Sequence, residues 1–183
     1  MAKYARQTVT DDVLSGSRVL VVEVHGRFCA VPLAHVVEIM RPLPVEAIAG
    51  APSFVRGISI IRGIPTPVVE LGVLLGVDNE KTLVGISARF VTLHLGERQA
   101  ALSVDVVCGV CNLDALSILE LPPLLQGASH NFIEAIATLD AQMLVILQSG
   151  WQLPEAVWES LAGTGSPQVP RSKMGTGEIS ESA

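Results

Sequence analysis

The chain is poor in aromatic residues and in charge, and each shortage excludes a class of function. Phe, Trp and Tyr make up 4% of its 183 residues, which disfavours a wide ligand cavity lined by rings. The charged fraction is 16% and the net charge is −6. No run of Lys and Arg is interleaved with aromatic residues, so we do not expect an extended nucleic-acid-binding surface.

Long apolar runs are also missing. No stretch approaches the roughly 20 residues needed to span a bilayer. The N-terminal sequence MAKYARQTVTDD lacks the apolar region of a signal peptide. These absences predict a cytoplasmic protein. In that compartment the three cysteines, Cys29, Cys108 and Cys111, would be reduced.

Sequence signatures of catalysis and metal binding are lacking as well. The chain has no Gly-x-Ser-x-Gly elbow, phosphate-binding loop or dinucleotide fingerprint, and its histidines have no His-x-x-x-His spacing. Cys108 and Cys111 lack the further ligands of a zinc site. They also lie in a β-rich stretch, where residues three apart point to opposite faces. We interpret them as small buried hydrophobes and predict no catalytic residue, cofactor or metal.

Apolar residues make up 49% of the chain, and their densest pattern predicts a β-hairpin. The arms Val55 to Ile61 and Ile64 to Leu71 are rich in Ile and Val and meet at Arg62-Gly63. Because Gly63 can meet the turn's need for a positive φ, a charged Arg62 at the tip suggests contact with a group outside the domain. A solvated turn cation is the alternative.

Two prolines restrict where the second arm can lie. Pro65 and Pro67 each remove a backbone donor. This arm should therefore lie at the edge of a sheet or be interrupted there.

The chain contains an internal repeat. A shift of 71 positions sets Val19–Met40 against Phe90–Cys111, and a shift of 78 positions sets Phe54–Glu70 against Phe132–Gln148. Each half then reads hairpin, short helical turn, strand, linker, hairpin, which is enough for a small five-stranded barrel. The two halves should meet in the linker near residues 76–81.

The two ends of the chain differ from its middle. Residues 153–161 place Leu153, Val157, Trp158 and Leu161 on one helical face, which predicts a short helix docked on the barrels. Residues 163–183 are rich in Gly, Ser, Thr and Pro with almost nothing to bury, so we expect a disordered tail. Residues 1–16 should form a flexible N-terminal segment.

The central hairpin resembles the core motif of the CheW-type chemotaxis coupling proteins, which runs roughly F-I-x-G-x-x-N-L-R-G-x-x-x-P-V-I-D-L. The matching residues are Phe54, Val55, Gly57, Ile61, Arg62, Gly63, Pro67, Val68, Val69 and Leu71. Ile60 and Glu70 depart from the family's usual Asn and Asp. Within residues 28–40, Val37-Glu38-Ile39 resembles the family's V-x-E-I element.

This resemblance implies a mainly β fold: two small, intertwined five-stranded SH3-like barrels packed together over residues 17–162, with short helices between strands and at the C-terminus. It implies a non-catalytic adaptor that couples methyl-accepting chemoreceptors to the histidine kinase CheA. Such an adaptor is cytoplasmic and is recruited to membrane-associated receptor arrays.

The resemblance also implies site residues. Those for the receptor are Val36, Glu38, Ile39, Arg62 and Val107. Those for the regulatory domain of the kinase are Phe54, Gly57, Ile58 and Gly63. Strand alternation alone could also place a Glu between Val37 and Ile39, and Val36 and Ile39 could equally belong to the core.

Two other functions stay open. Ile60 in place of Asn, and Gln148-Ser149 at the end of the last hairpin, would suit a CheW-like module of another motility or two-component pathway. A small β-barrel enzyme or ligand-binding protein would need a polar cluster inside a pocket, which this composition does not offer.

Overall fold

The computed structural model describes residues 18–76, 86–112, 117–119, 132–139, 141–148 and 153–163. The expectations for the N-terminal segment 1–16, for most of the linker 76–81 and for the tail after Gly163 fall outside these residues.

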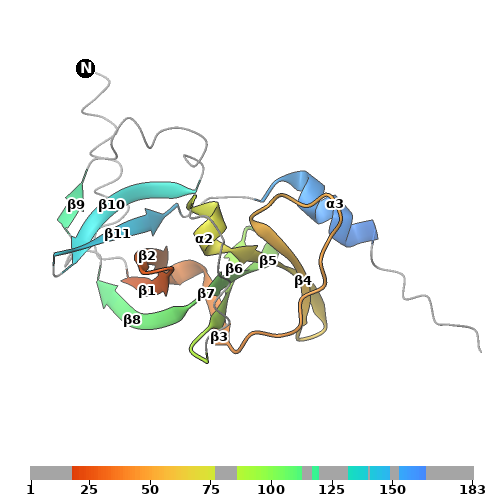
Figure 1. Ribbon diagram of the computed structural model, residues 1–183, viewed down its shortest axis with the longest axis horizontal. Coiled ribbons are helices and arrows are strands. Elements are labelled where there is room, and N and C mark those ends of the chain that lie inside the picture. The colour runs from red at the N-terminus through yellow and green to blue at the C-terminus, as the bar shows by residue number, and fades with distance from the viewer. Residues whose placement is uncertain are drawn as a thin grey trace, which may run out of the picture.

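Short strands dominate the described chain (Figure 1). The strands are β1 (Arg18–Val24), β2 (Arg27–Pro32), β3 (Val36–Met40), β4 (Val55–Ile61), β5 (Ile64–Glu70), β6 (Arg89–Leu95), β7 (Arg98–Val104), β8 (Val106–Asn112), β9 (Ser117–Leu119), β10 (Ile133–Leu139) and β11 (Gln142–Leu147). The helices are η1 (Leu33–His35), α2 (Leu71–Leu74) and α3 (Glu155–Gly163).

The strand boundaries confirm the internal repeat. Adding 71 to the bounds of β1 gives those of β6, and adding 71 to those of β3 falls within β8. Adding 78 to the bounds of β4 gives those of β10. The order of strands is therefore the same in both halves.

The strands form two sheets, which confirms the mainly β class. Sheet A has six strands in the order β8-β1-β2-β11-β10-β9, and sheet B has five in the order β3-β6-β7-β5-β4. Figure 1 shows sheet A on one side of the molecule and sheet B on the other. The pairings between described strands leave both sheets open rather than closed into barrels.

The two halves of the chain exchange strands. Sheet A takes β1 and β2 from the first half, and sheet B takes β6 and β7 from the second. The exchange is held by two parallel pairings, β2 with β11 and β5 with β7. The two subdomains are thus intertwined, because each sheet needs a hairpin from the other half.

The arm that contains the two prolines does not lie at a sheet edge, but its strand pairing is interrupted, which was the second of the two expectations. β5 lies inside sheet B, between β7 and β4. Its pairing with β7, however, starts only at Val68, so Pro65 and Pro67 pair with β4 alone. On the side of β5 away from β4, no described strand pairs with Pro65 or Pro67, so a backbone N–H is not needed there.

Most strands are buried on both faces. A shared core between the sheets takes residues from both, including Leu20, Val22, Val69, Val91 and Leu102. The alternate residues fill two smaller cores. That of sheet A includes Val19, Val21, Ala30, Ala137, Leu144 and Ile146, and that of sheet B contains Ile61, Val68, Phe90 and Ala101.

The C-terminal helix docks as predicted. Leu153 and Val157 are buried in the shared core, and Trp158 packs against it. The side chain of Leu161 lies outside the described part of the chain. Figure 1 shows α3 lying beside β4 and β5, so the chain passes from β11 in sheet A to cover sheet B.

A glycine in β4 is required by its neighbours. Gly57 has φ +150°, and a Cβ there would lie 2.1 Å from the carbonyl oxygen of Glu46. This close approach accompanies a backbone bridge, in which the N–H groups of Glu46 and Ile58 each donate to the other's carbonyl at 2.8 Å. The bridge extends sheet B beyond β4.

We predict that Gly57→Ala destabilises the protein by about 3 kcal/mol, because the methyl group meets backbone at a strained φ. The matched control is Gly63→Ala, where φ is +82° and no atom lies within 4 Å of the added Cβ. It should cost only about 1–2 kcal/mol. Urea unfolding of both variants measures the difference, and equal costs would contradict a steric role for Gly57.

Candidate functional site

The candidate site is built around an ion pair that joins the two ends of sheet B. Arg62 lies in the turn after β4, and Glu38 lies in β3, at the opposite end of the strand order. Arg62 Nε donates to Glu38 Oε1 at 2.9 Å, and a terminal nitrogen donates to Oε2 at 2.6 Å. Both ends of the open sheet are thereby held together by a bidentate contact.

The backbone of the turn places Arg62 for this contact. Both Arg62 (φ 51°) and Gly63 (φ 82°) have positive φ, as in the two-residue hairpin turns that favour Asn-Gly. Arg62 is an unfavourable residue in this conformation. Its described partner is Glu38 of the same domain, and a contact of Arg62 with a group outside the domain stays a prediction.

Each charge changes the other's pKa. The hydrogen bond from Arg62 holds the pKa of Glu38 below its ordinary value, and the hydrogen bond to Glu38 raises the pKa of Arg62. The Arg62 side chain is 73% exposed and that of Glu38 is 22% exposed. The pair therefore remains within reach of a partner from solvent.

A buried threonine hydrogen-bonds to the backbone of Glu38. Thr92 in β6 is buried, its hydroxyl accepts from the Glu38 N–H at 3.2 Å, and it donates to the Glu38 carbonyl at 3.2 Å. The pairing of β3 with β6 shifts register between Val36 and Glu38. The threonine thus supplies contacts that the irregular ladder leaves out. Sequence reasoning missed Thr92, because nothing in a Val-Thr-Leu strand marks the threonine as a partner.

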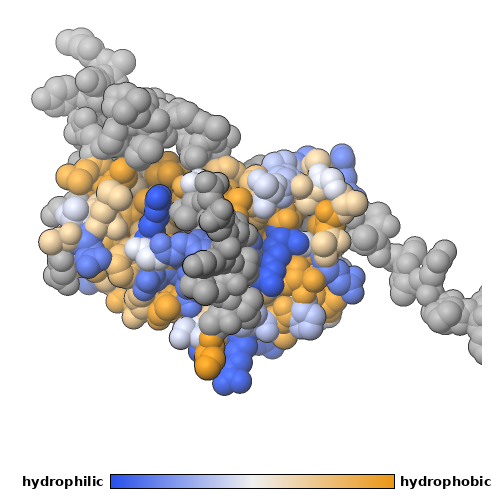
Figure 2. Space-filling model, in the orientation of Figure 1, coloured by the Kyte–Doolittle hydropathy of each residue, from blue (hydrophilic) through white to orange (hydrophobic). Residues whose placement is uncertain are grey.

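Exposed apolar side chains lie next to the ion pair in sequence. Val37 and Ile39, on either side of Glu38, are 41% and 43% exposed. Ile60 and Ile64, near Arg62 in sequence, are also exposed. Figure 2 shows apolar residues reaching the surface over both sheets. Of the two residues whose core or surface role was open, Ile39 is exposed and Val36 is partly buried against the shared core.

Val107 corresponds to Val36 in the repeat. It lies on β8, an outer strand of sheet A, and Val36 is the first residue of β3, an outer strand of sheet B. Both side chains are partly buried and pack against the shared core. The structure therefore brings Val36 and Val107 to one core, and Glu38 and Arg62 into direct contact.

The residues implied for the kinase lie along β4 and have clear structural roles. Phe54 packs against the shared core and meets Phe132, its counterpart in the repeat, edge to face with ring centroids 5.8 Å apart. Gly57 and Ile58 form the bridge to Glu46, and Gly63 completes the turn. The 78-residue shift could have identified the contact between Phe54 and Phe132.

Cys108 and Cys111 differ from their interpretation as buried hydrophobes, whereas the third cysteine is buried. Cys29 is fully buried, and burial raises its pKa to about 12. Cys108 is exposed and Cys111 is half-buried. Cys108 lies at a bulge, because Val107 and Gly109 face the consecutive residues Val22 and Val21 of β1. No group of three potential metal ligands occurs within the described ranges.

Sheet A has no described equivalent of the ion pair. The position equivalent to Glu38 is Gly109, and Asp140, equivalent to Arg62, falls outside the described residues. In its place is an open apolar hollow of about 280 Å³, with Val21, Phe28 and Leu144 among its lining residues. Within the described chain, no helix is long and apolar enough to cross a membrane.

Comparison with known proteins identifies the family. The family model described as the CheW-like domain matches residues 18–150. The chain belongs to the CheW-like domain family. The chemotaxis protein CheW of Klebsiella aerogenes is 26% identical over 150 residues, which cover 80% of this chain and 84% of that protein.

A solved structure has the same fold. The scaffolding protein TtCheW from Thermoanaerobacter tengcongensis superposes with a TM-score of 0.62 at 22% identity, covering 75% of this chain and 97% of TtCheW. The family match and the Klebsiella aerogenes relative support a scaffold or adaptor role in chemotaxis for this chain.

The ion pair should make stability depend on pH in the acid range. Because folding lowers the pKa of Glu38 from 4.5, the pair's contribution is present above that pH and is lost as the pH falls through the lower folded value. Acidification should therefore destabilise the wild type more than Glu38→Gln, by a small amount for so exposed a pair. Denaturant unfolding across this range measures the difference.

The control for this prediction is Arg62→Ala. In that background Glu38→Gln should no longer change the pH dependence, since the partner that lowers the pKa is gone. A difference that persisted without Arg62 would assign the effect to another group.

Proposed function

We propose that this protein is a non-catalytic adaptor that couples methyl-accepting chemoreceptors to the regulatory domain of the histidine kinase CheA. The proposal rests on membership of the CheW-like domain family. The structural observation that carries it is the Glu38–Arg62 pair, which links β3 to the β4–β5 turn where the sequence neighbours of both residues include exposed apolar side chains. The protein would work in the cytoplasm and at membrane-associated receptor arrays.

The receptor would bind along the outer strands β3 and β8. A receptor tip is an amphipathic helical hairpin, which suits a groove with apolar anchors and a charged rim. Val36, Ile39 and Val107 would supply the anchors, with Glu38 and Arg62 as the rim. A few such anchors are enough for a modest, reversible interface.

The kinase would bind at the hairpin of β4 and β5. Ile58 and Gly63 could touch a partner directly. Phe54 and Gly57 would act by holding the shape of β4, since the first packs against the core and the second closely approaches the Glu46 backbone. A pairing of this end with the similar double-barrel domain of the kinase would place receptor and kinase on adjoining surfaces.

Arg62→Ala should leave the fold intact and weaken binding to the receptor, the kinase or both by roughly tenfold to a hundredfold, the range for losing a charge-assisted hydrogen bond. Arg62→Lys should recover only part, because an ammonium cannot reproduce the planar two-point contact. Titration with a receptor signalling fragment and with a CheA regulatory domain measures both.

Arg56→Ala is the matched control for the receptor, because Arg56 lies on β4, before the turn, and pairs with Glu70 at 3.1 Å. It should leave the affinity for the receptor unchanged. The exchanged double variant Glu38→Arg/Arg62→Glu separates two roles for the pair. Restored binding would mean that the pair positions β3, whereas continued loss would mean that the partner reads the charges themselves. Wild-type affinity in Arg62→Ala would remove Arg62 from the site.

A related pathway is the second candidate. Ile60, where the family usually has Asn, is among the exposed large apolar residues beside the turn. An apolar residue at this place would suit a different partner, such as a diverged kinase of another motility or two-component system. Ile60→Asn should then improve binding to a CheA regulatory domain if the substitution is what has changed the partner.

A further inference from the structure

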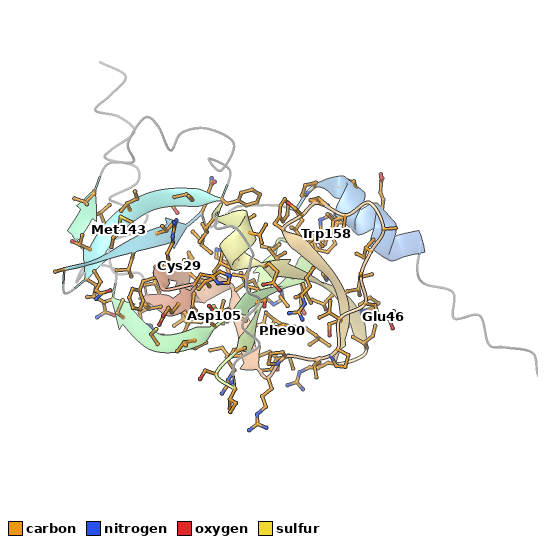
Figure 3. All side chains as sticks on the ribbon, in the orientation of Figure 1. Cys29, Glu46, Phe90, Asp105, Met143 and Trp158 are labelled. Carbon is orange, nitrogen blue, oxygen red and sulfur yellow. The ribbon has the colours of Figure 1, made fainter. Side chains whose placement is uncertain are left out.

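A second surface, distinct from the Glu38–Arg62 site, lies where the start of β5 meets the C-terminal helix α3. It is an open groove of about 550 Å³ between the start of β5, the β6–β7 turn and α3. Its lining includes Ile64, Pro65, Glu97, Trp158 and Glu159. Figure 3 labels Trp158 at α3.

The aromatic ring in this groove is held in place. The Arg98 guanidinium lies over Trp158, 4.9 Å from the ring centroid, and donates to both carboxylate oxygens of Glu155 at 2.8 Å. Arg98 is thus engaged by one acid and one ring. Glu97 and Glu159 are exposed and form no ion pair with any described residue. The groove therefore combines a fixed tryptophan and a proline with two free carboxylates.

This chemistry suits a proline-rich, basic segment. Ile64 and Pro65 belong to the half of β5 that pairs only with β4, and Pro65 has no N–H to offer an added strand. A ligand in polyproline II conformation needs no ladder of hydrogen bonds and docks on aromatic-lined grooves. The carboxylates of Glu97 and Glu159 would select Arg or Lys beside its prolines.

The chain carries such a segment directly after α3. Residues 167–173 read PQVPRSK, with Pro167 and Pro170 three apart and Arg171 and Lys173 following. Between residue 164 and residue 183, Arg171 and Lys173 are the only Lys or Arg residues. The composition that predicts no packed core for this tail is also typical of linear motifs that order only on binding.

We propose that residues 167–173 bind the groove of their own chain as a polyproline II segment, with the prolines against Trp158 and Pro65 and the basic residues at Glu97 and Glu159. The length of chain is sufficient. Gly163 ends α3 five residues after Trp158, about 7.5 Å along the helix axis. Four residues from Gly163 to Pro167 reach about 13 Å, and four more in polyproline II conformation cover about 12 Å.

Fluorine NMR of the full chain labelled with 5-fluorotryptophan tests this proposal. The chain has two tryptophans, Trp151 and Trp158, so Trp151→Phe assigns the signals. Arg171→Glu/Lys173→Glu and Pro167→Ala/Pro170→Ala should each shift the Trp158 signal to the same undocked position. Raising the salt concentration should move the wild-type signal toward that position, because the carboxylates are exposed.

Two matched variants sharpen the test. Glu178→Lys/Glu181→Lys changes the tail's charge by the same magnitude, with the opposite sign, outside the segment and should leave the Trp158 signal unchanged. Glu97→Lys/Glu159→Lys combined with Arg171→Glu/Lys173→Glu should restore the docked signal.

Two results would overturn the proposal. One is an identical Trp158 signal in the wild type and in both segment variants. The other is a docked signal that appears only as protein concentration rises, which would place the segment of one copy in the groove of another.

Discussion

The fold depends on one core that both sheets share. In β1, Leu20 and Val22 face this core while Val19 and Val21 face the smaller core of sheet A. A strand buried on both faces cannot leave one sheet without exposing the interior of the other. The exchange of hairpins between the halves follows from the same constraint, because the two parallel pairings run along strands that line the shared core.

The shared core also explains why the candidate site lies at sheet edges. Central strands are covered on both faces, so the partners of this protein can reach mainly β3, β8 and the hairpin turns. In sheet B, Glu38 on the edge strand β3 is held by two contacts: its backbone bonds to Thr92, and its carboxylate bonds to Arg62. In sheet A the equivalent of Glu38 is Gly109, and an apolar hollow lies there instead. The two repeats therefore keep one fold but differ in the chemistry of their outer edges.

The repeat made strand positions predictable from sequence, because both shifts align turn residues as well as apolar ones. The sheet order was not predictable from it. When β2 and β7 have the same pattern, the sequence does not say which of β5 and β11 each will join. The contact of Arg62 with Glu38 was missed for a similar reason, since it joins residues 24 apart across a sheet. Cys108 was misplaced because its burial was inferred from its residue type alone, and the bulge in β8 could not be seen in the sequence.

The geometry of the ion pair limits how Arg62 can contribute to binding. Its Nε and one terminal nitrogen already donate to Glu38, so a partner that used the same donors would have to break a bidentate contact. The remaining N–H groups are free to donate without that cost, and the side chain is mostly exposed. A partner can therefore add to the pair more easily than replace it. Binding would then stabilise the contact between β3 and the turn, and the apolar residues beside Glu38 would be held in the arrangement that the partner meets.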